Sequence, residues 1–193
     1  MFNRETAFSL FKEYNSDPWL FKHAFTMEAL MGYFAEQQGE NPEFWSLVGL
    51  LHDLDWEKHP DQHCIVAPII LREAGAPDEL IHAVCSHCWG FTTDVKPEST
   101  MEQLLYATDE LSGIVAAAAR LLPSGSVHDL KLSSLRKKYR NENFASGCDR
   151  AVIAKGAEML GMQVDELIEQ TLIGLTIVED NINKKFTEVF PTV

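Results

Sequence analysis

The sequence predicts an all-α fold. Strand-like alternation of apolar and polar residues is scarce, whereas apolar residues recur at spacings of three and four along most of the chain. Proline and capping residues stand where these apolar patterns begin, and glycine or proline stands where they end. With 193 residues, of which 46% are hydrophobic and 23% charged, the chain has the size and composition of one globular domain. We therefore expect a single domain over residues 1–193, without a clear linker.

The pattern up to residue 122 predicts a core of five helices. Asp17 and Asn41 are each followed by a proline, which combines a capping side chain with a rigid first turn. Ser99 and Glu102 have the spacing of a capping box, and the long helix that they begin ends before Pro123. The expected helices of this core, which spans about residues 18–122, are 18–38, 42–52, 60–75, 76–90 and 99–122.

The apolar pattern weakens after Pro123, where a C-terminal helical subregion is expected over about residues 123–185. Two helices are predicted there, at about residues 148–160 and 165–184. The tail from Phe186 to Val193 is expected to be frayed. A basic cluster precedes the two helices and consists of Arg136, Lys137, Lys138 and Arg140.

Composition excludes several classes of protein. The net charge of −13 disfavours binding to a nucleic-acid duplex or to an acidic membrane surface. No apolar stretch has the length of a membrane-spanning helix, and the N-terminus lacks the pattern of a signal peptide. The four cysteines form no dense disulfide framework. We expect a cytoplasmic protein with reduced thiols and no membrane partner.

Six polar side chains are predicted to face the core from five separate helices. His23, for example, shares a stripe with Leu20 and Met27, and Asp109 shares one with Leu105. A single inward histidine is usually a hydrogen-bonded core residue, but burying six such groups is costly unless they are paired or bind a metal. We expect them to meet in one polar centre: His23, His52, Asp53, His63, His87 and Asp109.

Imidazole and carboxylate ligands together suit a divalent metal such as iron, manganese, zinc, nickel or magnesium. Six ligands are enough for two ions, with one carboxylate bridging them. Two adjacent ions can generate hydroxide and stabilise charge on a phosphoryl group.

Other histidines and cysteines are weaker candidates for this centre. His82 shares a polar helix face and is expected to be exposed, whereas His59 lies in a loop and could line the entrance. Cys85 and Cys88 form a C-x-x-C motif with no second pair, so core packing is expected rather than a structural zinc site.

The segment Leu50-Leu51-His52-Asp53 resembles the signature of the HD superfamily, a helical family of metal-dependent phosphohydrolases. The resemblance covers about residues 18–122 and implies an HD-domain helical bundle with a C-terminal extension. By order and spacing, the core ligand positions of the family match His23, His52, Asp53 and Asp109. His63 and His87 match the two extra histidines of members that bind two ions.

The resemblance implies an enzyme that hydrolyses phosphate esters, including those of nucleotides, with a metal-activated hydroxide. Asp53 would hold or bridge the metal ions, and the substrate would be a small anionic phosphorylated molecule. The stretch 135–150 resembles an extension in a subset of uncharacterised bacterial members. The candidates for substrate binding there are Lys137, Lys138 and Arg150.

The chain departs from the family pattern directly after Asp53. Many members have a small residue, glycine and lysine there, and that lysine often contacts a substrate phosphate. No residue of this chain matches that lysine, so Lys58 in the same loop is the candidate substitute. Asp55 and Glu57 are candidates for a general acid or base beside the metals.

Two other functions stay open at the level of sequence. Some HD members with the same six ligands are similar to mixed-valence di-iron oxygenases, and His63 and His87 favour that reading. A non-catalytic domain that binds a metal or a ligand is the other alternative, favoured by the missing lysine.

Overall fold

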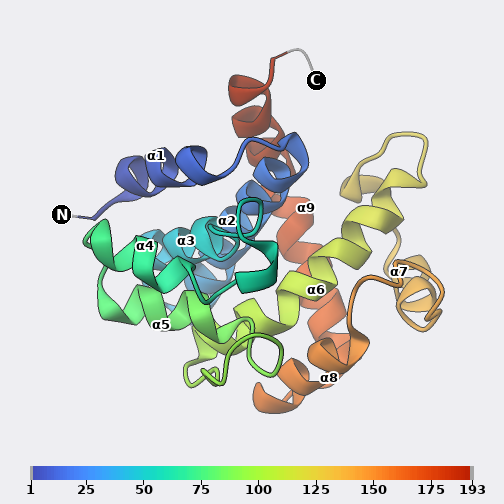
Figure 1. The fold of residues 1–193 in the computed structure, drawn as a ribbon. Helices are drawn as coiled ribbons and strands as arrows, with labels where there is room; N and C mark the ends of the chain where they lie inside the picture. Colours follow the sequence, from blue (N-terminus) through green and yellow to red (C-terminus); the bar gives the residue numbers. More distant parts are fainter. Residues whose placement is uncertain (1, 192–193) are drawn as a thin grey trace.

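The computed structural model describes residues 2–191, and the regular secondary structure of these residues is helical (Figure 1). The only β-type pairing among these residues is an isolated bridge between Trp89 and Thr93. The prediction of an all-α fold is therefore confirmed. The α-helices are α1 (Arg4–Tyr14), α2 (Pro18–Gln38), α3 (Pro42–Leu51), α4 (Ala67–Glu73), α5 (Asp78–Ser86), α6 (Thr100–Arg120), α7 (Leu132–Tyr139), α8 (Arg150–Met159) and α9 (Val164–Val189), and short 3-10 turns cover Pro60–Gln62 and Val127–Asp129.

The predicted capping residues form hydrogen bonds at the N-termini of α2, α3 and α6. The Asp17 carboxylate accepts a hydrogen bond from the Trp19 amide at the start of α2, and Asn41 caps α3 in the same way. At the start of α6, Ser99 Oγ accepts from the Glu102 amide, while Glu102 accepts from the Ser99 amide. These contacts satisfy amides that have no partner within the helix. They explain why these three starts were predictable.

Helix α1 was not predicted. The Asn3 side chain caps it by accepting from the Thr6 amide at 3.0 Å. Ala7 and Phe11, four residues apart, are its buried residues, and the helix packs against α3. The cap and the spacing of four were the signals for this helix in the sequence.

The predicted helix over residues 60–75 is wrong in its first half. A 3-10 turn at Pro60–Gln62 is followed by a bend at Cys64, which has a φ of 60°, and α4 begins only at Ala67. Proline at position 68 belongs in a first helical turn, not in the interior of a longer helix. His63 therefore lies in a turn rather than on a helical face.

The prediction of a frayed tail from Phe186 is wrong for residues 186–189, which belong to α9. This helix continues to Val189, and the ring of Phe190 lies 5.1 Å from that of Phe21 and 5.2 Å from that of Phe186. These aromatic contacts hold the end of the helix against the N-terminal part of α2. The last two residues, 192–193, lie outside the described residues.

Helices α2 and α3 pack at very close range around Gly49. A Cβ atom at this position would lie 2.4 Å from the Met27 carbonyl oxygen and 2.9 Å from the Glu28 amide nitrogen. Such separations are shorter than any ordinary contact, so glycine is required for the two backbones to approach. The approach brings the end of α3, with His52, against the middle of α2, with His23.

The long helix α6 packs against α2, and α9 runs beside α2 and also contacts α6, α7 and α8 (Figure 1). Gly156 on α8 faces Ala107 on α6, where an added Cβ would meet the alanine methyl at 2.3 Å. No helix in residues 2–191 is long and apolar enough to cross a membrane. The division into a core over residues 18–122 and a C-terminal subregion stays a prediction.

Candidate metal centre

Four donor residues meet where α2, the end of α3 and α6 come together. His23 Nε2 lies 3.0 Å from His52 Nε2 and 2.9 Å from Asp109 Oδ1. Asp53 Oδ2 lies 3.5 Å from His23 Nε2 and 3.3 Å from His52 Nε2. Bonds of about 2.0–2.2 Å to one ion place its ligand atoms at such separations. These four residues therefore form a candidate first metal position.

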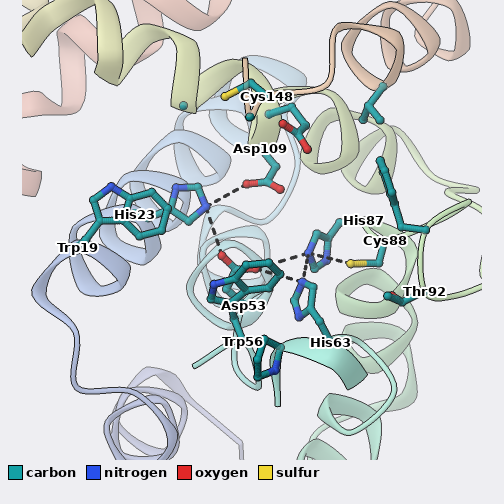
Figure 2. Close-up of a pocket in the computed structure, with 16 residues that line it drawn as sticks. Trp19, His23, Asp53, Trp56, His63, His87, Cys88, Thr92, Asp109 and Cys148 are labelled. Carbon is teal, nitrogen blue, oxygen red and sulfur yellow. Dashed lines mark hydrogen bonds and ion pairs between the residues drawn. The ribbon is translucent and has the colours of Figure 1, made fainter. Parts of the chain in front are cut away.

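A second group of donors lies on the other side of Asp53 (Figure 2). His63 Nε2 and His87 Nε2 are 3.1 Å apart. Asp53 Oδ1 lies 3.3 Å from His63 Nε2 and 3.7 Å from His87 Nε2. The two oxygens of Asp53 thus face two different groups of histidines, which is the arrangement of a bridging carboxylate.

Three of the imidazoles are oriented by a partner on the Nδ1 side. His52 Nδ1 donates to the Gly49 carbonyl oxygen at 2.8 Å, and His87 Nδ1 donates to the Val84 carbonyl oxygen at 2.6 Å. His63 Nδ1 donates to Asp55 Oδ1 at 2.7 Å. Metal-bound histidines typically have such a partner, because it leaves the lone pair on Nε2 free for the ion.

The carboxylates favour positive charge in the centre. Burial lowers the pKa of His52, but Asp53 and Asp109 outweigh burial and raise this pKa to about 9. Burial raises the pKa of Asp109, but hydrogen bonds from His23 and His52 hold it well below its usual range. A divalent cation supplies the same positive charge while the imidazoles bind in their neutral form. The donor set therefore fits a divalent metal.

A cavity of about 450 Å³ opens over these donors. Aromatic rings from three segments line it, namely Trp19, Trp56 and Phe91, and the Trp19 indole stacks on the His23 imidazole at 5.6 Å between ring centres. Within residues 2–191 its lining contains neither lysine nor arginine. The donors are thus accessible to a small molecule through an aromatic rim.

Asp55 does not face this cavity. Its side chain is fully buried beneath His63, and besides His63 Nδ1 it accepts from the Cys64 amide at 3.3 Å and from the Ala67 amide at 2.7 Å. Asp55 therefore positions His63 and begins α4. This environment argues against the general acid or base role that was expected of it.

The loop residues Lys58 and Glu57 point elsewhere as well. Lys58 Nζ donates to the Glu13 carbonyl oxygen at 2.6 Å and lies over the Tyr14 ring, away from the cavity lining. Glu57 accepts from the Ser16 amide at 2.7 Å and ties the start of α2 to the loop. Neither side chain occupies the place expected of a phosphate-binding or catalytic group.

The basic residues of the C-terminal subregion are likewise outside the cavity. Lys137 and Lys138 line a separate hollow that also includes Arg140. Arg150 donates to the carbonyl oxygens of Ala145 and Cys148, each at 2.8 Å, and so closes the loop before α8. The structure does not bring these residues to the candidate metal centre.

Three cavity residues were not predicted as site residues, and one of them, Cys88, was expected to pack in the core. Glu110 accepts from the Asp149 amide at 2.9 Å, and burial together with the charge of Asp109 raises the pKa of Glu110 to about 7. Trp19 lies four residues before His23 on one helix face, and Cys88 follows His87 directly. Adjacency to a predicted ligand was the available signal for each of them.

Comparison with known proteins identifies an HD domain in the chain. Residues 20–114 match the family model described as HD domain. Among curated proteins, ribonuclease Y of Geobacter sulfurreducens is 30% identical over 140 residues, which are 69% of this chain and 26% of that protein. Ribonuclease Y of Oleidesulfovibrio alaskensis is 27% identical over 113 residues, which are 57% of this chain and 21% of that protein.

The chain spans about a quarter or less of the length of these relatives. No solved structure matches it significantly. The matched residues of this chain, 20–114, include all six predicted donors, from His23 to Asp109. The chain belongs to the HD superfamily of metal-dependent phosphohydrolases, with its HD domain at residues 20–114.

Proposed function

We propose that this chain hydrolyses a small phosphate ester, of the nucleotide class, at a centre of two divalent ions. The observation that carries the proposal is Asp53, whose two oxygens face two separate histidine groups on the floor of an open cavity. Two ions so placed lower the pKa of a water molecule and neutralise charge on a phosphoryl group.

The residues of the chain have separate tasks in this proposal. His23, His52 and Asp109 hold one ion, His63 and His87 hold the other, and Asp53 fixes the distance between them. The backbone carbonyls behind His52 and His87 keep each imidazole in the orientation that binds a metal.

The cavity supports a small substrate with an aromatic part. Trp19, Trp56 and Phe91 offer ring faces on which a nucleobase can stack, and they keep bulk water from the centre. A volume of about 450 Å³ is within the range typical of small-molecule sites. The name of the relatives, ribonuclease Y, supports phosphodiester chemistry, whereas the net charge of −13 favours a small anion over a long nucleic acid.

The test is a panel of phosphomonoesters, phosphodiesters and nucleotides offered to the metal-reconstituted protein. We expect metal-dependent release of phosphate or nucleotide by the wild type and by His128→Ala, which alters a half-exposed histidine outside the cavity. His52→Ala should be inactive. Full activity of His52→Ala, or no metal-dependent release from any compound, contradicts the proposal.

An HD-type di-iron oxygenase is the second candidate function. It is favoured by the complete set of six donors beside a cavity whose described lining has no lysine or arginine to bind a phosphate. In that case the iron-loaded protein consumes O₂ together with an organic substrate, and zinc or manganese does not replace iron. Phosphate release with zinc or manganese and no O₂ uptake excludes it.

A further inference from the structure

A thiol lies among the donors of the second metal position. Cys88 Sγ is 3.5 Å from His87 Nε2, and its side chain lines the cavity. Figure 2 shows this sulfur directed at the His87 imidazole, with His63 beside it and Asp53 on the opposite side of His87. The nitrogen that faces the sulfur is the same atom that faces Asp53 Oδ1, at 3.7 Å. Cys88 therefore lies beside the donor nitrogens of the second group.

Three separations among these donors are close to those between the ligands of one tetrahedral ion. Bonds of about 2.3 Å to sulfur and about 2.0–2.1 Å to nitrogen or oxygen place tetrahedral ligands about 3.3–3.6 Å apart. The observed separations are 3.1 Å between the two imidazole nitrogens, 3.5 Å from Cys88 Sγ to His87 Nε2, and 3.3 Å from Asp53 Oδ1 to His63 Nε2. The ligand atoms of His63, His87 and Cys88 all lie within 4.8 Å of one another, and that of Cys64 belongs to the same group.

The two neighbouring thiols, Cys64 and Cys85, each contact a backbone carbonyl oxygen. Cys85 Sγ donates to the Cys64 carbonyl oxygen, with the two atoms 3.7 Å apart, and does not line the cavity. Cys64 Sγ lies 3.8 Å from His63 Nε2 and 4.0 Å from His87 Nε2, but it has the Val84 carbonyl oxygen as an acceptor at 3.6 Å. Of these three cysteines, Cys88 is the one that lines the cavity. Its sulfur also makes the shortest contact to an Nε2 atom of His63 or His87.

We propose that Cys88 is a thiolate ligand of the second ion, which is held by His63, His87, Cys88 and Asp53 and is selected as Zn²⁺. This inference rests on the proposed two-ion centre. Thiolate is a soft ligand that suits zinc and disfavours magnesium, whereas the first position offers only imidazole and carboxylate. The two halves of the centre thus differ in metal preference, and the C-x-x-C motif contributes one of its two cysteines to the site.

Cobalt substitution tests this assignment independently of activity. Two equivalents of Co²⁺ are added to the metal-free full chain, and the near-ultraviolet sulfur-to-cobalt charge-transfer absorption is recorded for wild type, Cys88→Ser, Cys85→Ser and Cys64→Ser. We expect the band in the wild type, in Cys85→Ser and in Cys64→Ser, and its loss in Cys88→Ser. Circular dichroism of each variant verifies that it is folded.

A zinc competition titration gives the second readout. Zn²⁺ affinity at the second position should fall at least about tenfold in Cys88→Ser, since even the loss of a group that supports a ligand costs about 10–100-fold. Binding of two Co²⁺ ions without a thiolate band overturns the proposal and leaves the two-ion centre intact. Loss of the band in Cys64→Ser but not in Cys88→Ser also overturns it. If the wild type binds no ion, the proposed centre itself fails.

Discussion

Replacing Asp55 with asparagine changes one oxygen of a buried carboxylate to an amide nitrogen and keeps the size of the side chain. The wild-type carboxylate accepts from three donors, namely His63 Nδ1, the Cys64 amide and the Ala67 amide. An asparagine has one acceptor oxygen, so its NH₂ group must face either Ala67 or the other two donors. If it faces His63, it favours the tautomer with hydrogen on Nε2, and that nitrogen can then no longer bind the second ion.

The size of the effect follows from these contacts. Loss of a hydrogen-bonding partner behind a metal-bound histidine typically costs about 10–100-fold in affinity or activity. At about 1.4 kcal/mol for each factor of ten, this is about 1.4–2.8 kcal/mol of binding free energy for the second ion. Leaving a buried donor without an acceptor also lowers the free energy of unfolding by about 1–3 kcal/mol.

Calorimetric titration of metal into the metal-free protein measures this effect. In Asp55→Asn we expect the first ion to bind as in the wild type, because the His23, His52 and Asp109 group does not touch Asp55. The second ion should bind at least about tenfold more weakly. Asp61→Asn, an exposed change in the same loop, is the matched control. Unchanged affinity for both ions in folded Asp55→Asn would refute the role given to Asp55.

Three further changes test other parts of the structure. Gly49→Ala should lower the free energy of unfolding by about 1–3 kcal/mol or more in a urea titration, because its Cβ overlaps the α2 backbone, whereas Gly147→Ala, with open space around it, should change little. Glu102→Gln should cost about 1–2 kcal/mol at neutral pH. Burial raises the pKa of Glu102, but hydrogen bonds from Ser99 and other donors lower it below its ordinary value of 4.5. The stabilisation is therefore present above about pH 4.5 and lost as the pH falls through the lower pKa of the folded state, so the urea-unfolding difference between Glu102→Gln and wild type should shrink at acid pH. His87→Ala should bind one ion where the wild type binds two, as measured by elemental analysis after gel filtration, and two retained ions would contradict its place in the second position.

The helices that carry the site were predictable because their signals are local. Asp17, Asn41 and the Ser99–Glu102 pair cap neighbouring amides, and the apolar stripes place His23 and Asp109 on inward faces. All six predicted donor residues come together in the structure. Their role as metal ligands stays a prediction.

The loop after Asp53 could not be predicted in the same way. Its course depends on Asp55, which accepts from an amide twelve residues further along the chain, at Ala67. Such a contact leaves no periodic signal in the sequence. The direction of Lys58 depends similarly on a carbonyl of α1, a helix that was not predicted. Side chains on irregular backbone were therefore misjudged, although the residue types were reasonable candidates.

The central claim is that Asp53 bridges two ions held by two histidine groups. Anomalous X-ray diffraction from crystals of the metal-reconstituted protein, recorded at the absorption edge of the added metal, tests it most directly. We expect two peaks on opposite sides of the Asp53 carboxylate, one against His23, His52 and Asp109 and the other against His63 and His87. No peak beside Asp53, or a peak on one side of its carboxylate alone, would contradict the account.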